Sequence, residues 1–167
     1  MIKIKEKEKC CGCTACLNVC PKGAISMLPD EEGFPYPLVD KEKCVGCDLC
    51  NKICPIIHPK TKEEKTQGYV IRNKNANILF ESTSGGAFTA FAEYVLHQQG
   101  VVYGAGYDKD MCVICKRATE SKHLSEIRGS KFVQSNLGSV FREVQADLHK
   151  NLLVLYTGTP CQIAGLL

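Results

Sequence analysis

Two cysteine runs of identical spacing stand near the N-terminus of this chain. Each follows the pattern C-x2-C-x2-C-x3-C-P, in which three thiols are close together and a fourth precedes a proline. Bacterial proteins hold [4Fe–4S] clusters with this pattern, because the iron of such clusters prefers thiolate ligands. The predicted ligands are Cys10, Cys13, Cys16 and Cys20 in the first run and Cys44, Cys47, Cys50 and Cys54 in the second. The spacing predicts two clusters and the transfer of single electrons.

The fourth cysteine of each run is expected to serve the cluster of the other run. Two-cluster ferredoxins exchange this ligand, so Cys54 would complete the first cluster and Cys20 the second. The alternative is zinc, which also takes four cysteines but rarely shows three-plus-one spacing with proline. Cys11 lies outside the spacing, and we interpret it as a spare thiol.

Composition indicates a reducing compartment and argues against a membrane span and against nucleic acid as a partner. The chain has 167 residues and 12 cysteines, and its first nine residues are charged, with no apolar signal segment. We therefore expect a cytoplasmic protein, and without a run of 18 apolar residues we expect no membrane span. Loading two oxidised clusters on eight thiolates would move the net charge from +3 to about −1, so the basic balance does not indicate nucleic acid.

The N-terminal part is an internal duplication, since Cys44 restarts the pattern 34 residues after Cys10. Between the runs, residues 24–28 and 34–39 predict two strands joined by a turn over 29–33. This leaves little ordinary core, so bound clusters would act as staples. Residues 58–67 are charged, lack large apolar side chains and are predicted to form a linker.

The remaining sequence alternates between strand and helix patterns, which predicts a layered α/β domain. The predicted strands are 69–72, 78–80, 101–107, 112–118 and 152–156. The predicted helices are 85–99, ending at Gly100, 121–127, one capped by Ser135 that runs to about His149, and one that follows 158–162. The apolar end of the chain predicts that this domain continues beyond Leu167.

Three polar segments of this second part could bind an anionic ligand. Residues 82–86, STSGG, precede a predicted helix and suit a phosphate, although the segment taken alone favours an ordinary helix cap. Residues 128–131, RGSK, bring two cations to a turn, or form a solvated loop. Residues 158–162, GTPCQ, follow a predicted strand, where open α/β sheets bind ligands.

The other cysteines carry weaker signals. Cys161 would lie near a flavin or be a small buried residue, and its exposure decides between these readings. Cys112 and Cys115 form a C-x-x-C in a predicted strand, where residues three apart point to opposite faces, so we interpret them as core thiols.

Together, STSGG, RGSKFVQS and GTPCQIAGLL resemble the N-terminal flavin-binding region of the coenzyme F-420 hydrogenase/dehydrogenase beta subunit family. Some members carry a two-cluster ferredoxin module, and the resemblance covers about residues 8 to 167. It implies an FAD-binding oxidoreductase that couples a hydride carrier, deazaflavin or nicotinamide, to the clusters. It places Ser84, Gly85 and Gly86 against FAD phosphates and Ser130, Lys131 and Gln134 along the flavin or its partner nucleotide. It places Gly158, Thr159, Pro160, Cys161 and Gln162 near the isoalloxazine ring.

We therefore expect an α+β / α/β architecture. A ferredoxin-like 2[4Fe–4S] module would occupy residues 1–57 and a partial flavin-binding layered α/β domain residues 68–167. The electron partner would be a coenzyme or a redox protein, and no side chain is required as a nucleophile. Two alternatives remain open: a non-enzymatic electron-transfer protein, and an inactive fragment that does not fold beyond residue 68. Tightly bound flavin would exclude the first, and protease resistance beyond about residue 60 the second.

Overall fold

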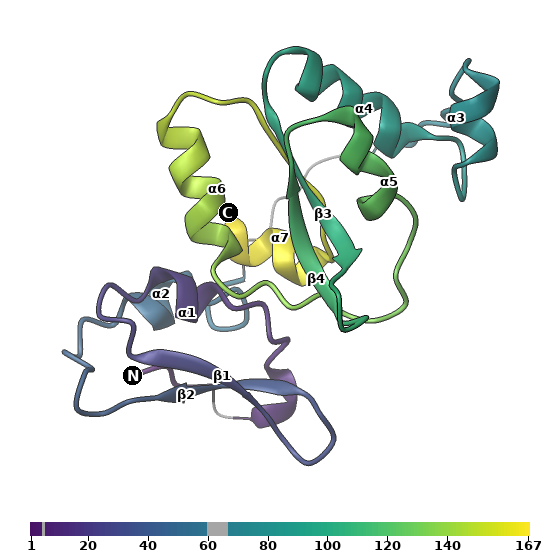
Figure 1. The fold of residues 1–167 in the computed structure, drawn as a ribbon. Helices are drawn as coiled ribbons and strands as arrows, with labels where there is room; N and C mark the ends of the chain where they lie inside the picture. Colours follow the sequence, from purple (N-terminus) through teal and green to yellow (C-terminus); the bar gives the residue numbers. More distant parts are fainter. Residues whose placement is uncertain (5, 60–66) are drawn as a thin grey trace. The chain divides into compact units, whose positions relative to one another are not determined.

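The computed structural model describes residues 1–4, 6–59 and 67–167, and it divides into two compact units (Figure 1). The first unit takes Met1–Lys62, Leu137–Glu143 and Thr159–Leu167, and the second takes Glu63–Asn136 and Val144–Gly158. Two late segments thus join the N-terminal unit, which the sequence division at residues 57 and 68 does not include. Most of the predicted linker, residues 60–66, lies outside the described residues.

The first unit contains the predicted hairpin. Strand β1 (Ile25–Pro29) pairs antiparallel with β2 (Pro35–Val39), with Ile25 opposite Val39. Asp30 shapes the turn, because its Oδ1 accepts hydrogen bonds from the backbone amides of Glu32 at 3.1 Å and Phe34 at 2.9 Å. The hairpin is confirmed, with each strand beginning one residue later than expected. A single 3-10 turn, η1 (Lys7–Lys9), precedes the first cysteine run.

The two cysteine runs fold in the same way. Helix α1 (Ala15–Val19) follows Thr14, and α2 (Leu49–Ile53) follows Asp48; both preceding residues have a left-handed backbone, with φ of 62° and 64°. Each helix ends at an extended cysteine, Cys20 or Cys54. A left-handed residue other than glycine costs free energy. The duplication therefore repeats a strained turn that curls each run back on itself.

The second unit is built on a small mixed sheet of order β4-β3-β5. The central strand β3 (Val101–Tyr107) pairs antiparallel with β4 (Val113–Ala118) and parallel with β5 (Val154–Tyr156). Helix α4 (Ala87–His97) and α5 (Leu124–Ile127), which extends the 3-10 turn η2 (Ser121–His123), pack on this sheet. The buried core comprises Ala92, Val95, Val102, Ala118, Leu124 and Ile127. The alternation of strands and helices is confirmed here, although β5 is half-buried rather than buried.

The predicted strand at 78–80 is wrong, because Ala76–Phe80 forms helix α3. Asn75 decides this outcome: its side chain accepts hydrogen bonds from the amides of Asn77 at 3.0 Å and Ile78 at 3.4 Å, as an N-cap does. Residues 69–72 form no strand either. The STSGG segment therefore follows a helix, and the argument that it lies at the carboxyl end of a strand does not hold.

Two helix boundaries also differ from prediction. Gln99, not Gly100, takes the left-handed conformation after α4, with φ of 58°. Gly100 is a close approach instead, because a Cβ there would lie 2.4 Å from the Leu153 carbonyl oxygen. Helix α6 (Val140–His149) begins after the predicted Ser135 cap, since Asn136 exchanges backbone hydrogen bonds beside β4, its amide donating to Val113 at 2.8 Å.

The last helix, α7 (Pro160–Leu166), belongs to the first unit. Its start is fixed by a capping box, in which the Thr159 amide donates to Gln162 Oε1 at 3.0 Å and Pro160 occupies the first turn. The predicted turn-to-helix passage is confirmed. Within the described ranges, no helix has both the length and the apolar character needed to cross a membrane.

A buried carboxylate joins three elements of the second unit. Asp147 of α6, with a side chain 4% exposed, accepts hydrogen bonds from Tyr103 Oη at 2.7 Å and from Arg117 Nε at 2.8 Å. A second bond from Arg117 Nη2, at 3.0 Å, makes the pair bidentate. The Arg117 guanidinium holds the pKa of Asp147 below its usual range, and burial raises the pKa of Tyr103.

We expect Asp147→Asn to destabilise the second unit by about 2 kcal/mol at neutral pH, because it leaves Arg117 and Tyr103 without their charged acceptor. A depressed folded-state pKa gives stability that is present above the unfolded value of about 4 and lost as the pH falls through the folded value. Thermal unfolding between pH 7 and pH 3 should therefore depend less on pH in the variant. The exposed Asp110→Asn is the control, and an unchanged pH dependence in Asp147→Asn would contradict this role.

Candidate metal centres and anion groove

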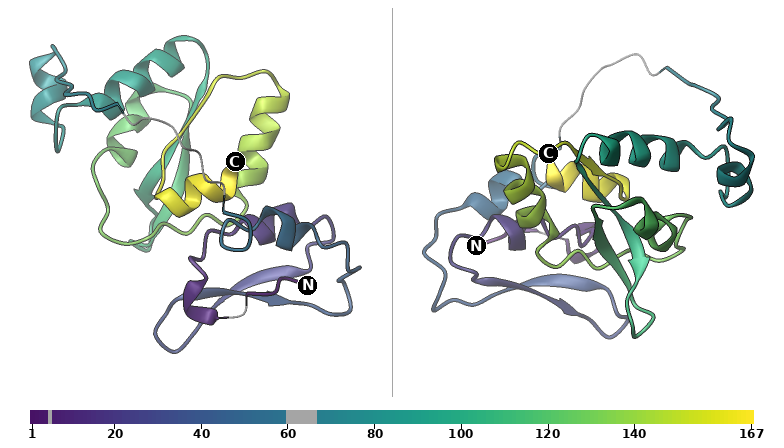
Figure 2. Two further views of the ribbon diagram at one scale, coloured as in Figure 1. Left: turned by 180° about the vertical axis from the view of Figure 1, so that it is seen from behind. Right: turned by 45° about the horizontal axis from the view of Figure 1, so that its top comes forward.

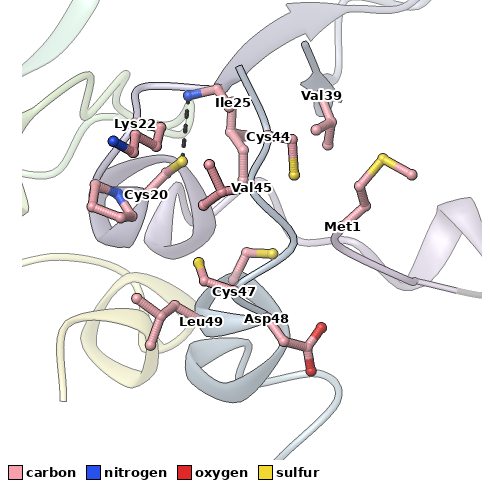
Figure 3. Close-up of a pocket in the computed structure, with 13 residues that line it drawn as sticks. Met1, Cys20, Lys22, Ile25, Val39, Cys44, Val45, Cys47, Asp48 and Leu49 are labelled. Atoms are coloured by element: carbon pink, nitrogen blue, oxygen red, sulfur yellow. Dashed lines mark hydrogen bonds between the residues drawn. The ribbon is translucent and has the colours of Figure 1, made fainter. Parts of the chain in front are cut away.

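Two cavities of the first unit have the eight predicted ligand cysteines in their walls, and Cys11 also lines the first of them. The first cavity has at its wall three thiols of the first run and the last thiol of the second: Cys10, Cys13, Cys16 and Cys54. The second cavity has the converse set, Cys44, Cys47, Cys50 and Cys20 (Figure 3). The structure thus brings together the same two sets that the ligand exchange requires. Their role as ligands stays a prediction.

Apolar side chains complete both walls. Ile2, Ile4 and Met27 line the first cavity, and Ile25 and Val39 line the second. Within the described part of the chain, no three potential ligands converge on one point as a single ion would need. The thiols stand around two cavities instead, which is the arrangement that suits a four-iron cubane with one thiolate at each corner. The donor set and its spacing therefore fit the predicted clusters.

Burial makes several of these thiols reluctant to ionise. Cys13, Cys16, Cys50 and Cys54 are buried, whereas Cys47 is exposed. Burial, followed by the charge of Cys10, raises the pKa of Cys16 to about 12, and burial also raises the pKa of Cys50. Because thiols ligate as thiolates, iron has to displace these protons, and loading should release acid.

A backbone amide supports the exchanged ligand of the second cavity. The Ala24 N–H donates to Cys20 Sγ at 3.3 Å (Figure 3). Hydrogen bonds to the sulfur atoms tune the reduction potential of iron–sulfur clusters. The start of the hairpin therefore contributes to the electronics of the site as well as to its shape.

Arg142 holds the end of α1, although it is more than 120 residues away in sequence. Its Nε donates to the Asn18 carbonyl at 2.8 Å, and its Nη2 donates to the carbonyls of Leu17 and Cys20, both at 2.9 Å. These carbonyls lie at the end of the helix, where those of Leu17 and Cys20 also accept backbone hydrogen bonds, from the amides of Cys20 at 3.4 Å and Gly23 at 3.3 Å. The Asn18 side chain in turn donates to the Gly138 carbonyl at 3.0 Å. No motif in the sequence identifies this contact, since only the tertiary structure brings Arg142 to the first run.

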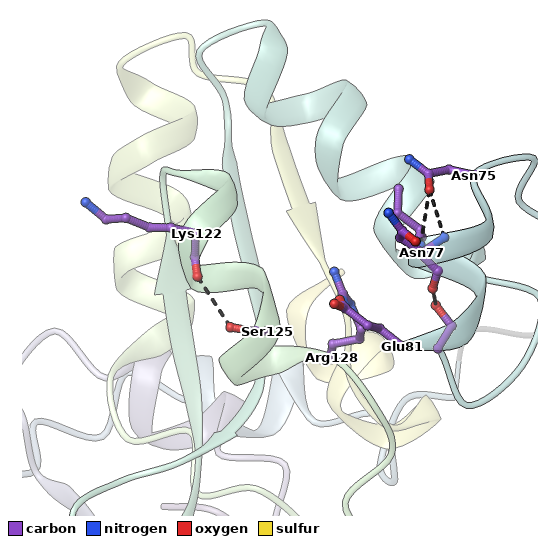
Figure 4. A network of polar contacts seen from close by, with 8 residues as sticks. Asn75, Asn77, Glu81, Lys122, Ser125 and Arg128 are labelled. Atoms are coloured by element: carbon purple, nitrogen blue, oxygen red, sulfur yellow. Dashed lines mark hydrogen bonds and ion pairs between the residues drawn. The ribbon is translucent and has the colours of Figure 1, made fainter.

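In the second unit, two of the three polar segments meet at an open groove of about 420 Å³. Thr83 of STSGG and Gly129, Ser130 and Lys131 of the RGSK turn line it, and Thr83 Oγ1 would lie 3.5 Å from a Cβ on Gly129. An ion pair joins Arg128 of the RGSK turn to Glu81, the residue that precedes STSGG (Figure 4). The groove volume is in the range of small-ligand sites.

The groove carries a cation that no carboxylate neutralises in the described contacts. Lys116 pairs with Glu126 at 2.5 Å, and Arg128 pairs with Glu81. Lys131 Nζ instead donates to the carbonyls of Arg128 at 2.9 Å and Gly129 at 3.2 Å, and lies 5.9 Å from the centre of the Tyr107 ring. Burial, followed by the charge of Lys116, lowers the pKa of Lys131. An anion in the groove would relieve this repulsion.

The other residues of the predicted flavin site are dispersed. The glycines of STSGG serve the fold itself, since a Cβ on Gly85 would lie 1.9 Å from the Ile71 carbonyl oxygen and Gly86 has φ of 77°. Ser84, Gln134 and Gly158 are exposed or nearly so, and are not among the groove residues. The remaining four predicted residues belong to the first unit: Thr159, Pro160, Cys161 and Gln162.

Three other cysteines differ in their surroundings. Cys11 and Cys161 are both half-buried. The core interpretation of Cys112 is wrong, because this thiol is exposed in the turn before β4, where its amide donates to Asp108 Oδ1 at 2.8 Å. Cys115, within β4, is half-buried.

Comparison with known families identifies the N-terminal region. Residues 9–56 match the family described as the 4Fe-4S dicluster domain. The N-terminal part of the chain is therefore a 4Fe-4S dicluster domain, which supports iron–sulfur clusters rather than zinc. A search of curated proteins found no match to the chain.

Replacing one exchanged thiol should expose the thiols of the opposite run. In Cys20→Ala, we expect anaerobic alkylation and peptide mass mapping to label Cys44, Cys47 and Cys50, because their cluster has lost its fourth ligand. Thiols of the first cavity should stay protected, and iron should fall from about eight to about four atoms per chain. Cys112→Ala is the control and should retain all its iron. Labelling of Cys10 and Cys16 in Cys20→Ala would contradict the exchange.

Arg142→Met should weaken the second centre, because it removes three hydrogen bonds to carbonyls at the end of α1, including that of Cys20. We expect iron to pass to a chelator several-fold faster and the first unit to lose about 1 kcal/mol of stability, since the bonds are solvent-exposed. Arg142→Lys keeps the charge but not the planar guanidinium, so its rate of iron release should lie between those of the unaltered chain and Arg142→Met. Lys109→Met is the surface control, and an unaltered release rate in Arg142→Met would refute the role.

Proposed function

We propose that this chain is an iron–sulfur electron carrier that passes single electrons through two [4Fe–4S] clusters in its first unit. The observation that carries this proposal is the lining of two cavities by two exchanged sets of four cysteines. Clusters of this kind, when bound, accept and release one electron each. The match of residues 9–56 to the 4Fe-4S dicluster domain supports the same reading.

The chain's own residues would place the two clusters next to each other and keep water away from them. Cys16 of the first cavity and Cys50 of the second pack with Ile25 in one buried group of side chains. Helices α1 and α2 pack together, and Leu17, Val19 and Val39 cover the same core. A short path between the cavities, lined by thiols and apolar groups, favours electron exchange within the unit.

We further propose that the second unit contributes to a flavin site, as in the coenzyme F-420 hydrogenase/dehydrogenase beta subunit family. Two observations support this finer proposal: the resemblance of three segments, and the meeting of two of them at the groove of Thr83, Ser130 and Lys131. The hydroxyls and the ammonium would hold phosphate oxygens. FAD, when bound, would exchange hydride with a deazaflavin or nicotinamide coenzyme and single electrons with the iron–sulfur module.

The groove distinguishes the flavin proposal from an electron carrier that works without flavin. A simple carrier needs no anion site in its second unit, whereas Lys131 is a half-buried cation with carbonyls and another lysine as its neighbours. In either case the thiolate ligands suit a reducing compartment, such as the cytoplasm, and a redox protein or coenzyme as electron partner.

The test is anaerobic reconstitution, followed by measurement of iron, sulfide and flavin per chain and by electron paramagnetic resonance after reduction. We expect about eight irons and the signals of two reduced cubanes. Zinc in place of iron, or about four irons in the unaltered chain, would overturn the carrier proposal.

The flavin proposal is tested on the same sample. We expect near-stoichiometric FAD and about tenfold weaker FAD binding in Lys131→Met, a loss typical of one charge-assisted contact. Lys109→Met is the matched control, because Lys109 is exposed and is not among the residues that line the groove. Two clusters with no FAD binding would leave the carrier and remove the flavoprotein.

A further inference from the structure

The two cysteine runs have the same spacing, but their surroundings differ. Positions in the two runs correspond at an interval of 34 residues, so that residues 13–15 are the counterparts of residues 47–49. All three residues of the first set are buried, and all three of the second set are exposed. The duplication therefore produces two unequal centres, of which the first is enclosed and the second is open to solvent.

Late segments of the chain provide the cover of the first run. A Cβ on Gly165 would lie 3.0 Å from Cys13 Sγ and 3.2 Å from Ala15 Cβ, so this glycine permits α7 to approach the run closely. The views agree that α7 lies beside α1 (Figure 2). The Asn18 side chain also donates to the carbonyl of Gly138, within Leu137–Glu143 of the same unit. These segments enclose the part of the first run whose counterpart in the second run is exposed.

The open side of the second centre is apolar. Met1, Val45 and Leu49 line the second cavity, and all three side chains are exposed (Figure 3). Cys47 lies in the same wall and is the one exposed thiol among the eight predicted ligands. Exposed apolar side chains that gather at one place, with polar residues around them, mark sites where another protein binds.

Two lysines flank this apolar surface. Lys22 is part of the cavity wall, and Lys52 lies three residues after Leu49 on α2, where residues at this interval are neighbours. Among the residues that the structure describes, neither lysine has an ion pair. Asp48, an acidic residue of the wall, is already engaged, because its Oδ1 accepts a hydrogen bond from Asn51 Nδ2 at 2.5 Å. Two cations without carboxylate partners favour a binding partner with an acidic surface.

We propose that electrons pass between this chain and its redox partner at the second centre, and that the partner is an acidic one-electron protein. The partner would bind to a docking surface formed by Met1, Val45, Leu49, Lys22 and Lys52. The inference rests on the proposed function, since it requires both clusters to be loaded. In each transfer the reduced second cluster loses one electron and the cofactor of the partner gains it, and no bond forms or breaks. The enclosed first cluster then exchanges electrons with the second one inside the unit.

The first experiment measures binding of the reconstituted, oxidised holoprotein to oxidised flavodoxin, an acidic one-electron flavoprotein, so that no electrons move. We expect the dissociation constant to rise several-fold between about 50 mM and about 300 mM salt, because salt screens exposed charges. Joint replacement by Lys22→Glu and Lys52→Glu should weaken binding at low salt by about tenfold. Lys74→Glu with Lys109→Glu is the matched control, because it changes the net charge equally at exposed lysines of the second unit.

The second experiment locates the docking surface without any variant. Carbodiimide joins lysine amines to the carboxylates of bound flavodoxin, and peptide mass mapping should find the links at Lys22 and Lys52. Because cross-linking uses the unaltered holoprotein, it tests the docking surface even if the doubly substituted variant loses iron. Cytochrome c, a basic one-electron protein, serves as the comparison and should bind more weakly than flavodoxin.

Several results would overturn the docking surface. These are absence of flavodoxin binding, binding that neither salt nor the double replacement weakens, links at other lysines in place of Lys22 and Lys52, and tighter binding of cytochrome c. Iron measured in the same samples separates this inference from the proposed function. About eight irons together with any of these results overturns the docking surface alone, whereas zinc or about four irons overturns the carrier itself.

Discussion

The exchange of one thiol between two cysteine runs is the constraint on which the first unit depends. Each cavity takes three thiols from one run and one from the other, so neither half of the duplication can close a cavity by itself. Helices α1 and α2 have to pack together and the hairpin has to bring Cys20 to the second run. The strained turns at Thr14 and Asp48 are each held by an asparagine, since Asn18 Nδ2 donates to Thr14 Oγ1 at 3.1 Å and Asn51 Nδ2 donates to Asp48 Oδ1 at 2.5 Å.

In the first unit, metal binding takes over part of the stabilising role that apolar burial has in an ordinary core. One buried group of side chains in the described part of this unit consists of Cys16, Cys50 and Ile25, so two of its three members are cysteines. So small an apolar cluster offsets little of the chain entropy lost on folding. Ligation by iron therefore contributes folding free energy as well as redox chemistry, and it does so by displacing protons that the buried thiols hold firmly.

The parts of the structure that were predictable from sequence are those encoded locally. Cysteine spacing, strand alternation around a turn and the apolar face of α4 all operate within a few residues. The short apolar run at Ile78 is ambiguous between strand and helix, and the Asn75 cap decided it. The start of α6 was misplaced because Asn136 pairs beside β4. Arg142 and the meeting of Thr83 with Gly129 depend on tertiary contacts, which no local pattern encodes.

The return of Leu137–Glu143 and Thr159–Leu167 to the first unit affects how the protein is made. A ribosome releases the eight predicted ligand cysteines early, more than 80 residues before it releases Arg142. During that interval the nascent chain presents its cysteines without the residue that clasps α1 and without the helix that lies on Cys13. Cluster assembly before the end of translation would act on an open module, whereas assembly afterwards would act on a closed one. Because the first unit is built from segments far apart in the sequence, the structure that receives the metal depends on whether delivery comes before or after the last residues are synthesised.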